Sequence, residues 1–260
     1  MRLITRVLTA TLAALLVPLA AAAGPHMALP KDFPANMTVL PGKRVFNMLG
    51  KKPLAIPPYQ ATEFRQGPVT FPQFDVVTVG AGNIAISRTA SQTKQGYRFK
   101  LEENGHPAWD AQCRLERSSS ATRVEGKTSS VEKMGEIVQA LQCELRDQAG
   151  GDPWLLVLRA DIHPRLFTVD ADSDGALVRG ETTIKVTATY AIEGWSVSSP
   201  QPSGFLFARG GNWVAAAEWT PPGSLRLDPT LEPGERGPIA AASAALLLYA
   251  TLSTPALAMH

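Results

Sequence analysis

The strongest constraint on the fold is an apolar run late in the chain, IAAASAALLLYATL at Ile239–Leu252. Pro238 precedes this run, and proline is favoured in the first turn of a helix. A helix built from these residues would carry apolar side chains on every side, which is typical of a helix that is buried in a core or spans a membrane. Because a membrane span needs about 20 residues, the run predicts a core helix, with a tail anchor as the alternative.

The chain between Phe74 and this run is divided into short segments that are typical of β-strands. Apolar residues recur at every second position over 97–101 and 184–190, and this period places them on one face of a strand. The sequences ENG at 103–105 and RGGNW at 209–213 are typical of hairpin turns. We therefore predict a mainly β fold, an antiparallel β barrel or roll with a buried hydrophobic C-terminal helix.

The order of these segments resembles that of a known group of proteins. The stretches GFLFARGGNWVAAAEW (204–219), SLRLDP (224–229) and PIAAASAALLLYATL (238–252) are similar to the C-terminal part of the tubby-like barrel group, which includes the phospholipid scramblases. YRFKL (97–101) followed by WDAQCRLE (109–116) is similar to the order of strand motifs in that group. The resemblance implies a hydrophobic helix threaded through an antiparallel barrel over roughly residues 70–252, and a link to membranes or phosphoinositides. No cluster of basic residues matches a phosphoinositide site, so no functional residue is carried over.

The N-terminal residues are typical of a secretory signal peptide. Arg2 and Arg6 precede an apolar run at 7–19, and small alanine residues follow at 21–23. An N-terminal membrane anchor is the alternative, but the apolar run is short for a span. We predict cleavage near Ala23 and a periplasmic or secreted mature protein.

The composition after the signal peptide suggests two regions. Residues 24–72 are rich in proline and show no helical or strand period, so we predict an extended arm that lies along the domain or is partly disordered. GPHM at 24–27 looks like a remnant of cloning, and we expect it to have no structural role. Residues 73–260 are predicted to form a single β domain that includes the C-terminal helix.

The two cysteines, Cys113 and Cys143, lie in alternating segments. Cys113 shares a face with Trp109 and Leu115, and Cys143 shares a face with Leu141. An exported protein enters a compartment where disulfides persist. We predict a disulfide between the inner faces of neighbouring antiparallel strands, which would stabilise the fold by roughly 3–4 kcal/mol. A pair of buried free thiols is the alternative.

The sequence DADSDGALVRGE at 170–181 fits the calcium-loop template D-x-D-x-D-G-x5-E. The template assigns the metal ligands to Asp170, Asp172, Asp174, the carbonyl of Ala176 and Glu181. The flanking residues read as β segments rather than helices, so an EF-hand is not expected. Two interpretations remain: a calcium loop between β elements, or a plain acidic turn rich in Asp, Ser and Gly.

A second motif, DVVTVGAGNIA at 75–85, has the outline of a dinucleotide fingerprint. That fingerprint requires a helix after its glycines, whereas Ile84 and Ile86 have the spacing of a strand. A hairpin at 80–83 explains the same residues, and we expect no nucleotide cofactor.

Other signs of chemistry are sparse. The chain has no G-x-S-x-G nucleophile motif, and its four histidines lack the spacing of metal ligands. Removing Arg2 and Arg6 from the 25 basic residues leaves 23, which equals the number of acidic residues. A neutral chain without a basic stripe is not expected to bind nucleic acid.

These observations favour an exported, non-catalytic envelope protein that binds an envelope lipid or a protein partner. A calcium-dependent binding module that uses residues 170–181 is the alternative. An enzyme without a recognisable local motif is the third hypothesis.

Overall fold

The structure is a computed structural model. It describes residues 25–43, 54–71, 73–81, 84–125, 130–164, 169–196, 198–199, 201–221 and 223–252. The predicted signal peptide lies outside the described residues.

Within these residues, the fold contains strands and one helix. The elements, in chain order, are β1 (Thr38–Pro41), β2 (Ala55–Ile56), β3 (Tyr59–Thr70), β4 (Gln73–Ala81), β5 (Ile84–Glu103), β6 (His106–Glu125), β7 (Ser130–Asp147), β8 (Trp154–Pro164), β9 (Val169–Arg179), β10 (Thr182–Thr189), β11 (Gly204–Arg209), β12 (Asn212–Glu218), β13 (Ser224–Leu227) and α1 (Pro233–Leu252).

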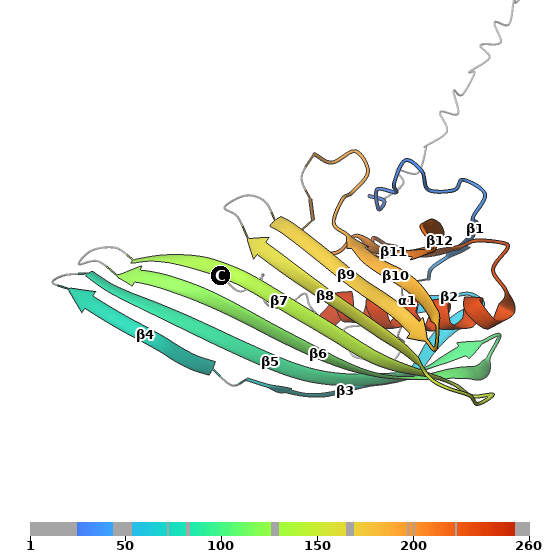
Figure 1. The fold of residues 1–260 in the computed structure, drawn as a ribbon, viewed down its shortest axis with the longest axis horizontal. Helices are drawn as coiled ribbons and strands as arrows, with labels where there is room; N and C mark the ends of the chain where they lie inside the picture. The colour runs from blue at the N-terminus through green and yellow to red at the C-terminus, as the bar shows by residue number, and fades with distance from the viewer. Residues whose placement is uncertain are drawn as a thin grey trace, which may run out of the picture.

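The strands form one antiparallel sheet that curls into a nearly closed barrel (Figure 1). The order around the barrel is β1-β13-β12-β11-β10-β9-β8-β7-β6-β5-β3-β2, and β4 lies off this path and pairs with β5. Lys43, just after β1, bridges to Ala55 in β2, and its amide donates to the Ala55 carbonyl at 2.7 Å. The two ends of the sheet therefore meet, and few strand edges remain open.

Helix α1 fills the barrel and supplies the centre of the hydrophobic core (Figure 1). It contacts β6 and β7 on one side and β11, β12 and β13 on the other. Its alanines allow the helix to approach the sheet closely, and the large side chains of Trp154, Phe205 and Phe207, each at most 1% exposed, fill the remaining space. This arrangement confirms the predicted barrel around a buried C-terminal helix.

The helix begins earlier than the sequence predicted. The carbonyl of Glu232 accepts hydrogen bonds from the amides of Glu235 and Arg236 at 3.0 and 3.1 Å. An additional turn therefore forms before Pro238, which lies inside the helix rather than at its start. Within the described residues, no helix combines the length and the apolar character of a transmembrane segment.

Three strands are much longer than the sequence predicted. β5 and β6 each have 20 residues and β7 has 18. Their polar parts, including SQTKQ at 91–95 and SSSATRVE at 118–125, lack the alternating apolar residues that predict a strand. In the structure these parts leave the barrel and extend beyond it with β4 (Figure 1). A sheet exposed on both faces has no apolar face to bury, so the alternation is absent.

This extension is called the projecting sheet below. It consists of β4, residues 84–94 of β5, residues 117–125 of β6 and residues 130–136 of β7. Ala81 pairs with Ile84, so β4 and β5, which contain most of the dinucleotide-like motif at 75–85, form an antiparallel hairpin, as expected. The other two predicted hairpins are also confirmed, because β5 pairs with β6 and β11 pairs with β12.

The predicted division at residue 73 is wrong. β1 pairs with β13, and β3 pairs with β5 as part of the barrel. The proline-rich composition hid these strands because prolines at 41, 58 and 68 lie at their ends or irregularities. Residues 44–53 of the predicted arm, including three of its basic residues, lie outside the described residues.

Candidate functional site: the tip of the projecting sheet

The disulfide lies on the inner face of the barrel, as the alternation of apolar residues predicted. Cys113 of β6 and Cys143 of β7 are directly opposite each other and form a disulfide. Their exposed fractions are 3% and 0%. The bond therefore joins two long strands inside the barrel, just before they enter the projecting sheet.

The predicted calcium ligands do not come together in a loop. Residues 169–179 form the extended strand β9, whose ends lie about 30 Å apart at the usual rise of a strand. Asp170 is opposite His163 in the register, Asp172 is opposite Asp161, and Asp174 forms an ion pair with Lys185. Ala176 lies between β8 and β10, and Glu181 lies in the turn that follows β9.

The prediction that these residues form a loop is therefore wrong. Among the described residues, no three His, Cys, Asp or Glu side chains lie close enough to hold a metal ion. Gly175, which the template assigns to a sharp turn, has a different role. A Cβ atom at this position would lie 2.5 Å from the Val157 carbonyl oxygen and 2.9 Å from the Leu158 side chain.

The tip of the projecting sheet carries a row of aliphatic residues across all four strands. In the register, Val79 is opposite Ile86, Ile86 is opposite Val124, and Val124 is opposite Val131. Directly opposite residues of an antiparallel pair share a face. The side chains of Val79, Ile86 and Val124 are 63%, 45% and 39% exposed. We call these four register positions the aliphatic row; across four strands it is about 14 Å wide.

Basic residues lie beside the aliphatic row on the same face. Arg88, Thr122 and Lys133 are directly opposite one another and lie two residues from the row on their strands, so they share its face. Arg88 and Lys133 are exposed. Among the described side chains, the nearby ion pairs join other residues, Lys94 to Glu116 at 3.4 Å and Arg123 to Glu125 at 2.9 Å. The tip therefore combines exposed apolar surface with positive charge.

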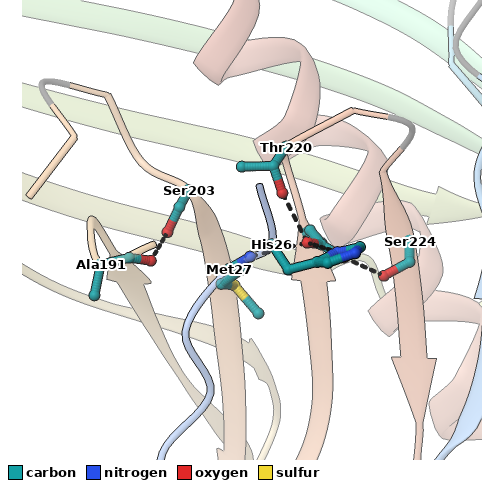
Figure 2. Close-up of polar contacts among 7 residues, drawn as sticks. His26, Met27, Ala191, Ser203, Thr220 and Ser224 are labelled. Atoms are coloured by element: carbon teal, nitrogen blue, oxygen red, sulfur yellow. Dashed lines mark hydrogen bonds and ion pairs between the residues drawn. The ribbon is translucent and has the colours of Figure 1, made fainter. Parts of the chain in front are cut away.

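A second polar site, around Glu218, was missed in the sequence. Glu218 ends β12 and its side chain is buried, with 4% of the residue exposed. Its Oε1 accepts hydrogen bonds from the Met27 amide at 2.9 Å and the Thr220 hydroxyl at 2.7 Å, and it lies 3.0 Å from His26 Nδ1 (Figure 2). Its Oε2 accepts a hydrogen bond from the Ser224 hydroxyl at 2.8 Å.

These contacts hold the N-terminal segment against the barrel. Met27 forms a bridge with Ile192 and packs against Leu206 and Ala216, with 5% of the residue exposed. The Ser203 hydroxyl orients the same region by donating to the Ala191 carbonyl at 2.7 Å (Figure 2). The expectation that residues 24–27 have no structural role is therefore wrong for His26 and Met27. The isolated acid at the end of NWVAAAEW was the available signal, because a buried carboxylate needs hydrogen-bond donors.

The electrostatics of Glu218 favour the ionised carboxylate. Burial raises its pKa, while hydrogen bonds from Thr220, Met27, Ser224 and His26 lower it, and the resulting pKa lies below the ordinary value. A serine nucleophile requires histidine between its hydroxyl and the carboxylate. Here Ser224 and His26 contact the same carboxylate instead, an arrangement that anchors a segment rather than activates a hydroxyl.

Comparison of this chain with protein-family models, curated proteins and solved structures gave no match.

Proposed function

We propose that this chain is an exported, non-catalytic envelope protein that contacts lipid through the tip of its projecting sheet. The observation that carries the proposal is the exposed aliphatic row with Arg88 and Lys133 beside it. Aliphatic side chains favour the boundary of the acyl chains, and basic side chains favour anionic headgroups. Membership of the tubby-like barrel group stays a prediction.

The position of the row supports this proposal. The projecting sheet extends beyond the barrel, so its tip can reach a flat surface without contact from the described part of the barrel (Figure 1). Helix α1 fills the barrel interior, so we expect lipid to bind on the outer surface of the protein rather than inside the barrel. The disulfide is consistent with an oxidising compartment and so supports export.

The magnitudes favour reversible binding. Each basic residue near an anionic surface contributes about 1 kcal/mol. Each buried methylene contributes about 0.8 kcal/mol, and the aliphatic side chains at the tip are short and already partly covered. Either contribution alone gives weak binding, so we expect both the aliphatic row and the basic residues to be needed.

The proposal is tested by co-sedimentation of the mature protein with vesicles of phosphatidylcholine, with and without phosphatidylglycerol. The wild-type protein is expected to pellet with the anionic vesicles and to be released by salt. The triple variant Val79→Thr, Ile86→Thr and Val124→Thr keeps β-branched residues in the strands and is expected to bind at least tenfold more weakly.

The matched control changes exposed aliphatic residues elsewhere. Leu155 and Val157 of β8 are 44% and 42% exposed on the outside of the barrel. The variant Leu155→Thr and Val157→Thr is expected to bind like the wild-type protein. Absence of wild-type binding to either vesicle, or an equal loss in this control, would refute the tip as the lipid contact.

A further inference from the structure

A half-buried arginine lies on the inner face of the sheet where the projecting sheet meets the barrel. Arg117 belongs to β6, two and four residues beyond the inward-facing Leu115 and Cys113, so it lies on the same face as the barrel lining. In the register it is opposite Thr93 of β5 and Gln139 of β7. Arg117 is therefore on the face opposite to the aliphatic row.

Polar side chains gather around the last turns of α1 near this arginine. The Tyr249 hydroxyl donates to Gln139 Oε1, and the Tyr97 hydroxyl donates to the Ala245 carbonyl at 2.9 Å. Tyr249 interacts electrostatically with Arg117, Tyr97 and Tyr190. Residues from β5, β6 and β7, and from the end of β10, thus meet at one end of the helix.

Two hydrogen-bonding groups of this cluster are buried without a partner. They are the Tyr190 hydroxyl, in a residue that is only 6% exposed, and Gln95 Nε2. Gln95 is opposite Leu115 in the register and thus lies diagonally from Arg117. A buried donor without a partner costs about 1–3 kcal/mol, so unpaired donors at one place point to a missing acceptor.

The charge at the cluster has one sign. Burial lowers the pKa of Arg117, and the neighbour that raises it is the Tyr249 phenol rather than a carboxylate. Burial also raises the pKa values of Tyr97 and Tyr190, so both phenols remain protonated donors at neutral pH. A guanidinium, a phenol and an amide that all donate are complementary to an oxyanion.

We propose that the cluster of Arg117, Tyr190 and Gln95 binds the oxyanion group of a ligand, a carboxylate or a phosphate, at the mouth of the barrel. Arg117 is exposed enough to be reached from solvent, and its planar fork suits both oxyanions. This binding site is separate from the lipid contact at the tip, which lies on the other face of the sheet. It goes beyond the proposed function and does not depend on it.

The experiment is isothermal titration of the mature protein with three probes. Inorganic phosphate and hexanoate supply the free oxyanions, and dihexanoyl phosphatidylglycerol below its micellar concentration supplies a lipid phosphate. The wild-type protein is expected to bind at least one probe, and the preferred probe identifies the source of the oxyanion. Arg117→Gln is expected to weaken that binding at least tenfold.

Two further variants keep the result decisive if Arg117→Gln does not fold. Tyr190→Phe removes a hydroxyl without a partner, so it is expected to keep the wild-type melting temperature while weakening binding about threefold or more. Arg114→Gln changes an exposed arginine of the same strand on the outer face and is expected to bind normally.

The outcomes separate this proposal from the proposed function. The triple variant of the tip is expected to titrate like the wild-type protein. No heat from any probe, binding unaltered by both Arg117→Gln and Tyr190→Phe, or an equal loss in Arg114→Gln would overturn the oxyanion site while leaving the lipid contact at the tip untouched.

Discussion

At the scale of single residues, Glu218 shows how one buried carboxylate organises distant parts of the chain. It connects β12 to His26 and Met27, which lie 192 and 191 positions earlier in the sequence. The cost of burying the charge is offset because both oxygens accept hydrogen bonds. The N-terminal segment is therefore attached to the barrel by hydrogen bonds as much as by apolar packing.

We expect Glu218→Gln to lower the free energy of unfolding by about 1–3 kcal/mol, because the amide cannot accept all of these hydrogen bonds. The folded-state pKa of Glu218 lies below its ordinary value of 4.5. The ionised carboxylate thus adds stability at neutral pH that is lost as the pH falls below about 5 and through the folded-state pKa. Urea unfolding between pH 3 and pH 7 measures both effects.

The control is Glu181→Gln, which changes an exposed acid in a turn. This variant should match the stability of the wild-type protein at neutral pH and keep its full pH dependence. The Glu218→Gln variant should lose stability less steeply on acidification. If both variants keep the same acid slope, Glu218 is not the group that titrates.

At the scale of elements, β8 and β9 show why a motif can match a template and still fold differently. Gly175 lies opposite Leu158, and the two backbones leave no room for a Cβ atom. The glycine of the calcium template is thus explained by strand packing. The template depends on residue types at fixed positions, whereas the β-branched residues of β10 favour pairing of β9 into the sheet.

We expect Gly175→Ala to destabilise the protein by about 1–3 kcal/mol, because the added methyl group would overlap the Val157 carbonyl oxygen and the Leu158 side chain. Gly96→Ala is the matched control, since its Cβ atom would meet only the Cys113 carbonyl oxygen at an ordinary 3.7 Å. Chemical denaturation followed by circular dichroism measures both. Equal stability of the two variants would contradict the close packing of β8 and β9.

The sequence predicted the elements that have a buried face and missed those that do not. Tyr97, Phe99 and Leu101 alternate because they line the barrel, and this alternation predicts a strand. The polar continuation of the same strand has no such pattern, because neither of its faces packs against the core. The aliphatic row could not be predicted from the sequence for a related reason. Its members lie on four different strands, and only the register brings them together.

At the scale of the whole molecule, one core serves the entire barrel. Leu246 of α1 is completely buried and belongs to the cluster that includes residues from nearly every strand of the barrel. Removal of a side chain from this helix leaves a cavity that the surrounding strands cannot fill without opening the barrel. Such a cavity therefore destabilises the whole sheet rather than one element.

We expect Leu246→Ala to lower the free energy of unfolding by about 2–5 kcal/mol in a single transition. Leu155→Ala, at an exposed position of β8, should cost less than about 0.5 kcal/mol. Tryptophan fluorescence and far-ultraviolet circular dichroism should give coincident curves in urea. Separate transitions in the two signals would show that the barrel and the helix unfold independently.

The position of α1 in the chain has a consequence for how the protein is made. Every strand is synthesised before α1, yet the strands enclose it. A nascent chain that carries every described strand still lacks the side chains that fill its interior, and its inner faces are apolar. Such a chain is expected to need a holdase chaperone until α1 is available to fill the barrel. The arrival of α1, rather than the pairing of the strands, is then the event that commits the chain to its native state.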